Sequence, residues 1–234
     1  MILEDILFTQ GFGTRHDCRA LARSGLVEIG GEVRDDPDED FETDGLVFVV
    51  RGESWPYCEK AILALHKPAG YECSLKPSAH PSVMTLLPAP LRRRGVQPVG
   101  RLDVDTTGVL LFTDDGRLLH RLIHPKRHVS KTYTVVIDTP LTEEMKAGFA
   151  TGVTLADGTA LSPAEVSALT PDGLTVRVLL RQGVYHQIKR MFGVYDAGVN
   201  TLHRLSIGGV ALDETLAPGE YRELTEEERK QLQN

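Results

Sequence analysis

The segment GRLDVDTTG, residues 100–108, places two carboxylates two positions apart, just before the strand-like run VLLFT. A carboxylate can act as a nucleophile or as a general base. Two carboxylates can also hydrolyse a glycosidic bond, but in an extended segment Asp103 and Asp105 would lie too close together to straddle a sugar. One of them could instead work alone, with a cation to keep it ionised. Spacing alone favours loop aspartates that form local hydrogen bonds with the backbone.

A second segment, HQIKRMF at residues 186–192, predicts the start of a helix with Ile188 and Phe192 on one face. Lys189 and Arg190 lie near that start, where cations oppose the helix dipole. Their placement indicates a partner anion, although a plain surface helix would carry the same residues.

Three other features have chemical meaning only in the right context. Tyr133 in KTYTV is by default a core aromatic of a strand, and otherwise a platform on which a base could stack. Histidines recur every four residues from His120 to His128, a spacing seen in zinc sites, but Pro125 interrupts the helix and no further ligand completes the set. The arginines at residues 92–94 could equally face solvent or contact phosphates. No metal site is expected.

The chain carries a formal net charge of −7, which by itself argues against a polyanionic partner. The charge is divided unevenly along the sequence. Residues 1–55 have a net charge of −8, whereas residues 61–135 have a net charge of +6 and five of the eight histidines. The middle of the chain could therefore follow a nucleic-acid backbone while the whole molecule stays acidic.

The cysteine content and the hydropathy pattern predict a cytoplasmic protein. Three scattered cysteines without C-x-x-C spacing argue against a disulfide framework and fit a reducing compartment. The longest apolar runs are only long enough for strands, so no membrane partner is expected. The first residues, MILEDILFTQ, carry acids instead of the basic leader of a signal peptide.

These candidate residues need a scaffold, and the sequence pattern predicts an α+β fold. Strand-like runs dominate, with helices between them but no regular βαβ period, which indicates a mixed sheet. Residues 1–50 predict helix, helix, hairpin and strand, with capping-box spacing at Thr14 and Asp17 and a tight turn at Gly30-Gly31. RGESWPYCEK is the expected linker. The expected domains are therefore residues 1–57, which include the linker, and residues 58–234.

Taken in order, several segments resemble one family. GRLDVDTTG followed by VLLFTDDG, then KTY, GVYHQIKRM, LHRLSIGG and LAPGEYREL, is similar to the pseudouridine synthases, and KPAGYECS before GRLD matches them too. The resemblance covers almost the whole chain and is closest to the branch that modifies small-subunit ribosomal RNA. The N-terminal unit resembles the small RNA-binding domain named after ribosomal protein S-four. The implied fold is a central mixed, mainly antiparallel sheet preceded by this small α/β domain.

The resemblance also implies roles for particular residues. Asp103 is the expected catalytic aspartate, Tyr133 the ring that stacks on the target uracil, and Lys189 the cation that pairs with Asp103. The residues expected to bind the substrate are Arg101, Leu102, His186, Ile188 and Arg190.

The reaction that the resemblance implies is the isomerisation of a uridine in RNA. The base leaves its N-glycosidic bond, turns, and rejoins the ribose through carbon five. Extruding the nucleotide costs roughly a few kcal/mol, and stacking on an aromatic ring returns about 1–3 kcal/mol per base. Ile188 and Leu102 would wall the pocket against water, and Arg101 would help to hold the RNA around the extruded nucleotide. No metal, nucleotide or redox cofactor is implied.

The expected substrate is ribosomal RNA or a partly assembled small-subunit particle, and nothing in the sequence requires more than a monomer. The alternatives are a synthase acting on large-subunit RNA, a non-catalytic RNA-binding factor in ribosome assembly, and a glycosidase that releases uracil. The acidic N-terminal segment departs from the pattern of RNA-binding domains. Arg15, Arg19 and Arg23 could still form one basic stripe, and we expect this domain to bind RNA weakly alone and mostly to orient the substrate.

Overall fold

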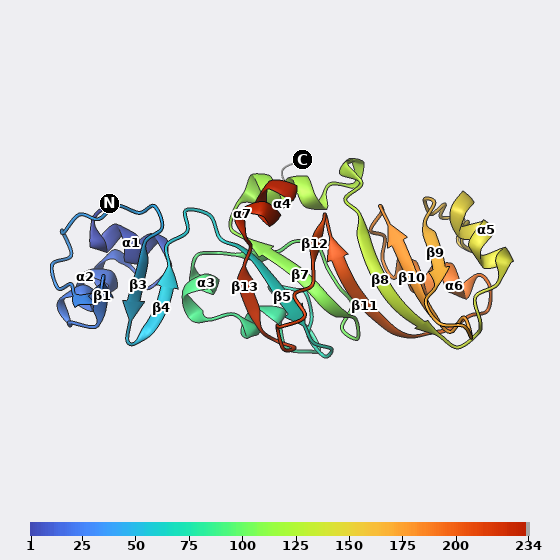
Figure 1. Ribbon diagram of the computed structural model, residues 1–234, viewed down its shortest axis with the longest axis horizontal. Helices are drawn as coiled ribbons and strands as arrows, with labels where there is room; N and C mark the ends of the chain where they lie inside the picture. Colours follow the sequence, from blue (N-terminus) through green and yellow to red (C-terminus); the bar gives the residue numbers. More distant parts are fainter. Residues whose placement is uncertain (233–234) are drawn as a thin grey trace. The chain divides into compact units, whose positions relative to one another are not determined.

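The computed structural model describes residues 1–232 and divides them into two compact units, both drawn in Figure 1. The first unit consists of Met1–Ala61 and Leu87–Gln97, and the second of Ile62–Leu86 and residues 98–232. Each unit has its own cluster of buried hydrophobic side chains. The first unit thus includes a segment, residues 87–97, that lies beyond the boundary expected from the linker.

The first unit combines short helices with a small antiparallel sheet. Its elements are α1 (Leu3–Thr9), α2 (Arg15–Arg23), β1 (Val27–Ile29), β2 (Glu32–Val33), β3 (Val47–Val50), β4 (Glu53–Pro56) and α3 (Ala89–Arg93). The strands lie in the order β2-β1-β3-β4. Strand β4 shows that the linker interpretation of RGESWPYCEK was wrong. Trp55 on β4 pairs with the buried Phe48 on β3, and Phe12 packs edge-on against both rings.

Helix α2 and the hairpin after it form where the sequence predicts. The Thr14 side chain accepts a hydrogen bond from the Asp17 amide, and the Asp17 carboxylate accepts one from the Thr14 amide, which completes the capping box. Gly30 and Gly31 have φ values of 65° and 80°, the left-handed conformation that a tight hairpin turn requires.

The arginines of α2 do not form the open basic stripe that their spacing suggested. The Arg15 and Arg19 guanidinium groups lie 2.7 and 2.6 Å from the Glu4 carboxylate, and their hydrogen bonds hold the pKa of Glu4 below its ordinary value. Arg19 also donates two hydrogen bonds to Asp38, at 2.9 and 2.7 Å. Two of the three cations of the stripe are therefore engaged with acids of their own unit.

The second unit is built on the mixed, mainly antiparallel sheet that the resemblance implied. Its strands are β5 (Ile62–Lys67), β6 (Gln97–Pro98), β7 (Thr107–Thr113), β8 (Lys131–Ile137), β9 (Glu165–Ala168), β10 (Thr175–Leu180), β11 (Val199–Ile207), β12 (Val210–Ala211) and β13 (Tyr221–Glu223). The main order is β13-β5-β7-β11-β8-β10-β9, with β12 beside β11 and β6 beside β7. Neighbours along this order are antiparallel except β7 and β11, which pair in parallel.

The helical segments of the second unit connect these strands. They are η1 (Val83–Leu86), α4 (Gly116–Ile123), η2 (Pro125–Arg127), α5 (Glu143–Thr151), α6 (Gln187–Gly193) and α7 (Glu226–Gln231). Helix α4 begins at Asp115, whose carboxylate accepts hydrogen bonds from the amides of Arg117 and Leu118, and it ends before Pro125 as predicted. Within residues 1–232, no helix is long and apolar enough to cross a membrane.

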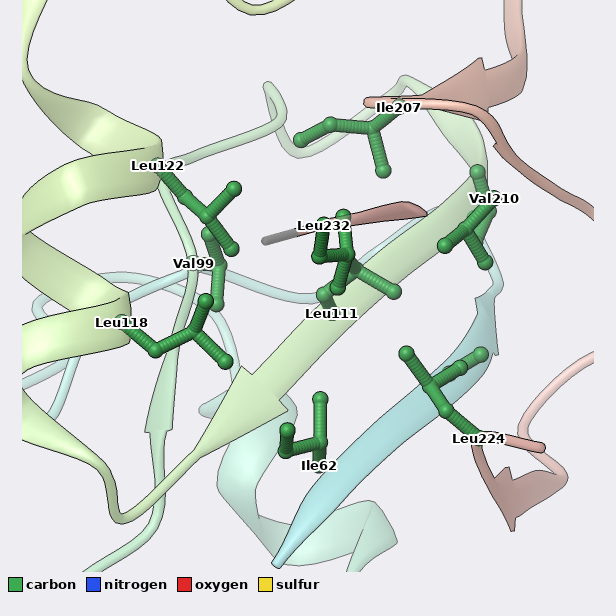
Figure 2. Close-up of a cluster of buried hydrophobic side chains, with 11 residues drawn as sticks. Ile62, Val99, Leu111, Leu118, Leu122, Ile207, Val210, Leu224 and Leu232 are labelled. Atoms are coloured by element: carbon green, nitrogen blue, oxygen red, sulfur yellow. The ribbon is translucent and has the colours of Figure 1, made fainter. Parts of the chain in front are cut away.

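The core under α4 fixes the sheet that carries the site. Figure 2 shows Leu118 and Leu122 of α4 beside Leu111 of β7, with Leu232 closing the same cluster. Burying each such side chain stabilises the fold by roughly 1.5–3 kcal/mol. Gly108, near the start of β7, lies very close to the backbone of β11. A Cβ at this position would come within 2.2 Å of the Arg204 carbonyl oxygen.

Candidate active site

Asp103 and Asp105 lie on a tight turn that leads into β7. The Thr106 amide donates to the Asp103 carbonyl oxygen at 3.1 Å, and the Gly70 amide donates to the Val104 carbonyl oxygen at 2.8 Å. From the sequence, this segment was expected to be extended. That expectation was wrong, because these hydrogen bonds turn the chain before β7 begins. The Asp103 side chain is 25% exposed and the Asp105 side chain 70% exposed.

A buried cation, missed by the sequence analysis, holds this turn in place. Lys67 at the end of β5 is fully buried, and its Nζ donates to the carbonyl oxygens of Asp103 at 3.1 Å and Thr106 at 2.8 Å. It also donates to the carbonyl oxygens of Pro68 and Val104, at 3.0 and 3.3 Å. Burial lowers the pKa of Lys67. The signal in the sequence was a lysine at the end of an apolar run, where its donors must find buried acceptors.

Lys189 on α6 reaches both carboxylates of the turn. Its Nζ donates to the two carboxylate oxygens of Asp105 at 2.8 and 2.7 Å, and lies 3.6 Å from Asp103 Oδ2. The hydrogen bond from Lys189 holds the pKa of Asp105 below its ordinary value. The sequence analysis paired Lys189 with Asp103 alone. The structure brings the two together as an ion pair, and places the shorter contacts on Asp105.

His186, the residue that directly precedes α6, lies beside the carboxylate oxygen of Asp103 that does not face Lys189. Its Nε2 lies 3.3 Å from Asp103 Oδ1, and its backbone is left-handed, with φ 50° and ψ 33°. The exposed Tyr185 ring stacks on the imidazole at 3.7 Å between ring centroids. Strained conformations of non-glycine residues tend to occur at functional sites. His186 was expected to bind substrate, and the structure places it directly beside the candidate carboxylate.

The other expected residues of α6 lie at its buried and exposed sides. Ile188 is buried, as an apolar wall would be. Arg190 is bonded to Asp157, an exposed acid of the same unit, so its guanidinium is already engaged in this structure. Gln187 anchors the start of the helix by accepting a hydrogen bond from the Val184 amide at 3.1 Å.

Tyr133 lies on the sheet that supports the turn. It sits on β8 between Arg204 of β11 and Val178 of β10, and only 7% of it is exposed. Arg204 is itself buried, and its Nε donates to the Val109 carbonyl oxygen at 2.8 Å, just after the turn. On the same strand as Tyr133, burial lowers the pKa of Lys131 to about 8.

Arg101 and Leu102 precede the turn and have opposite surroundings. Leu102 is buried, and its amide donates to the Cys73 sulfur at 3.4 Å. Arg101 is exposed. Leu102 is therefore placed to exclude water, while the guanidinium of Arg101 is open to a ligand.

The arrangement fits one working carboxylate better than a pair. Asp103 lies between a lysine and a histidine, whereas Asp105 shares the lysine and faces solvent. A cation beside a partly buried carboxylate compensates for the water it has lost. The chemistry available is nucleophilic attack or proton abstraction by Asp103 at an electrophilic or acidic carbon.

Comparison with known proteins gives a consistent result over most of the chain. The sequence profile described as RNA pseudouridylate synthase matches residues 61–193. A protein of Bacillus subtilis (strain 168), named uncharacterized RNA pseudouridine synthase YtzG, is 41% identical over 97% of this chain and 96% of its own length. The ribosomal small subunit pseudouridine synthase A of Escherichia coli (strain K12) is 46% identical over 70% of each chain.

A solved structure shows a similar fold. A crystal structure of a pseudouridylate synthase superposes with a TM-score of 0.70, with 34% sequence identity and 99% of each chain covered. The similarity therefore takes in the turn with Asp103, strand β8 with Tyr133 and helix α6 with Lys189.

Proposed function

The chain belongs to the RNA pseudouridylate synthase family, and on that basis we propose that it converts a specific uridine of small-subunit ribosomal RNA to pseudouridine. It is an isomerase. The choice of small-subunit RNA is supported by the name of the Escherichia coli relative. The observation that carries the catalytic assignment is the position of Asp103, with His186 Nε2 at 3.3 Å and Lys189 Nζ at 3.6 Å.

The isomerisation needs a carboxylate but no net change in composition. The glycosidic bond from ribose to the base nitrogen breaks, a bond from ribose to carbon five forms, carbon five loses a proton and the nitrogen gains one. Asp103 acts either as a nucleophile at the ribose or as a base that removes a ribose proton. Both routes require the carboxylate to be ionised and within reach of the sugar.

The neighbouring residues have supporting roles in this proposal. Tyr133 stacks on the uracil, Lys189 provides the countercharge for Asp103, and Ile188 closes the apolar wall. The remaining substrate-binding residues are Arg101, Leu102, His186 and Arg190. Arg190 would have to exchange its bond with Asp157 for a contact with RNA.

The wider setting is also part of the proposal. The enzyme acts in the cytoplasm as a monomer, on ribosomal RNA or a partly assembled particle, and it uses no metal or other cofactor. Residues 1–57 form an S-four-like domain, which orients the substrate, and residues 58–234 form the catalytic domain. The split of charge along the sequence supports RNA contact by the catalytic domain.

The test is tritium release from RNA labelled at carbon five of uracil, because that proton leaves during the isomerisation. Small-subunit RNA is offered naked and with its early-binding proteins, and large-subunit RNA is the parallel substrate. We expect release from a small-subunit substrate by the native protein and none by Asp103→Asn, which should fold and bind RNA normally. An RNA product of unchanged mass excludes the glycosidase.

Three results would redirect the assignment. Release from large-subunit RNA alone would move the proposal to the other ribosomal subunit. RNA binding without release from any substrate would favour the non-catalytic assembly factor. Loss of the folded state in Asp103→Asn would give Asp103 a structural role instead of a catalytic one.

A further inference from the structure

Asp105 is an exposed carboxylate with no part in the chemistry described so far, yet it makes shorter contacts with Lys189 than Asp103 does. Both of its oxygens accept hydrogen bonds from Lys189 Nζ, at 2.8 and 2.7 Å. Asp103 Oδ2 lies 3.6 Å from the same nitrogen, beyond hydrogen-bond distance. In this structure Lys189 is thus bonded to Asp105 and only an electrostatic neighbour of Asp103.

Both partners of this contact are attached to well-held backbone. Lys67 and the Gly70 amide bond the carbonyl groups of the turn that carries Asp105. Lys189 extends from the first turn of α6, whose buried Ile188 packs into the core of its unit. A cation in the first turn of a helix is opposed by the helix dipole, and a nearby carboxylate offsets that opposition. Asp105 supplies this carboxylate from a segment 84 positions away in the sequence.

We propose that Asp105 is a positioning residue, which holds the Lys189 ammonium beside Asp103 without letting it form a short hydrogen bond to that carboxylate. The inference rests on the proposed function and concerns how its catalytic group is kept ready. Asp105 itself touches no reacting atom. It acts through Lys189. The Lys189 ammonium is hydrogen-bonded to Asp105 and at the same time provides the countercharge for Asp103.

The physical reason lies in the freedom of the lysine side chain. Lysine is a compact charge on a flexible four-carbon stem with three donors. Two donors fixed on Asp105 leave the charge near Asp103 while Asp103 Oδ2 makes no short hydrogen bond with Lys189 and stays available for the ribose. Without Asp105, the ammonium would either close onto Asp103 and occupy its oxygens, or move out into solvent. Either change lowers turnover, because displacement of a catalytic group by about 1 Å can cost on the order of a hundredfold in rate.

The competing explanations make different predictions. As a structural tether between turn and helix, Asp105 would affect stability before rate, yet exposed ion pairs contribute little to stability. As a direct contact to the substrate, it would change KM. As a positioning residue that works through Lys189, it changes kcat, and only while Lys189 is present.

The experiment is a double-mutant cycle on turnover in the full-length protein. The variants are Asp105→Asn, Lys189→Met, the double variant and Asp105→Glu, with kcat and KM from tritium release and thermal unfolding of each. Glu143→Gln is the matched control, since Glu143 forms a 2.7 Å bridge to Lys146 on α5. Asp105→Glu keeps the charge and tests rescue.

We expect Asp105→Asn to lower kcat by about ten- to a hundredfold with KM changed less than about twofold. In the Lys189→Met background the same change should alter kcat by less than about twofold, because coupled residues are not additive. Asp105→Glu should recover part of the loss, and Glu143→Gln should match the native protein. Unfolding temperatures should be unchanged.

Several outcomes would overturn the inference. They are an unchanged kcat in Asp105→Asn, a purely KM effect, full additivity with Lys189→Met, or a loss of rate that only follows a loss of stability. The native protein is measured in the same assay. If it releases no tritium, the proposed function fails and this inference with it, whereas native turnover with an unaffected Asp105→Asn counts against Asp105 alone.

Discussion

Tyr133 is the residue whose role depends most on its ring. It is almost fully buried on β8, in register with Arg204 and Val178. If the ring stacks on the extruded base, Tyr133→Phe should retain most of the native kcat. Tyr133→Ala should lose about ten- to a hundredfold or more, from the roughly 1–3 kcal/mol of stacking. Single-turnover kinetics measure both, with circular dichroism as the control for folding. Equal losses in the two variants would point to the hydroxyl instead of the ring.

Lys67 makes a separate prediction, about stability. Replacing it by methionine keeps the volume but removes the ammonium donor to the Thr106 carbonyl oxygen and one of the two donors to the Asp103 carbonyl oxygen. Each lost partner of a buried polar group costs about 1–3 kcal/mol. We therefore expect Lys67→Met to lower the free energy of unfolding by at least about 1 kcal/mol, measured by urea denaturation, and to abolish turnover. Unchanged stability would mean that water or backbone movement satisfies the turn.

Among single residues, the sequence identifies the candidate site residues better than the residues that hold them in position. Asp103 and Lys189 stand in motifs with recognisable spacing, and the structure brings them together. Lys67 and the bond from Asp105 to Lys189 were missed, since their partners lie 36 and 84 positions away. Such contacts depend on the path of the chain through the sheet, which local spacing does not encode.

Among the connecting elements, the loop after β5 is closed by a single carboxylate. Glu72 accepts hydrogen bonds from the amides of Ser78, Ala79 and His80, at 3.0, 2.8 and 2.9 Å. Its backbone pairs with Pro81 and Val83. The bonds from the three amides lower the pKa of Glu72 from 4.5 to about 2. Cys73, next in the chain, accepts a hydrogen bond from the Leu102 amide, so this loop adjoins the segment that leads into the turn with Asp103.

The lowered pKa predicts how the loop responds to acid. Because the folded pKa lies below the unfolded one, the stabilisation is complete above pH 4.5 and is lost as the pH falls towards about 2. The amide proton shifts of Ala79 and His80, followed by NMR, should therefore titrate with a midpoint near 2. The same amides should show no such titration in Glu72→Gln. A midpoint near 4.5 in the native protein would show that the carboxylate does not bind these amides.

Element prediction succeeded where local chemistry is strong and failed where pairing with other segments decides. The capping box at Thr14 and the glycine turn at Gly30-Gly31 were placed correctly because each is a local backbone requirement. Strand β4 was missed because its polar residues and proline are typical of a linker. Its pairing with β3 and the contact between Trp55 and Phe12 come from tertiary packing. The turn at Asp103 was also missed, because its hydrogen bonds with Lys67 and with the Gly70 amide are tertiary contacts.

For the whole molecule, the distribution of charge decides which part can hold RNA. Residues 1–55 have a net charge of −8, and both Arg15 and Arg19 are bonded to acids of the same unit. Binding to a nucleic-acid backbone depends on cations that are free to replace its counterions. The expected S-four-like domain therefore has little electrostatic attraction of its own to offer.

The acidic net charge and the engaged arginines of the first unit predict weak RNA binding by the separated N-terminal segment. Residues 1–57 should bind small-subunit RNA at least about tenfold more weakly than the whole chain at the same salt concentration. Fluorescence anisotropy measures both affinities. Circular dichroism must accompany it, because the first unit also includes Leu87–Gln97. Equal affinity of a folded segment and the whole chain would show that the N-terminal domain is the main RNA-binding surface.

The pairing of strands in the catalytic unit also has a consequence in time. Strand β5, which carries Lys67, pairs with β13 through Leu65 and Tyr221, and β7 pairs with β11 through Thr107 and His203. At about 5–20 residues per second, roughly ten to thirty seconds pass between the synthesis of β5 and that of β13. Throughout that interval the nascent chain exposes the unpaired edge of β5 on which β13 will lie. All the residues of the candidate site, up to Lys189, are thus made before β13, the strand that completes this edge of the sheet.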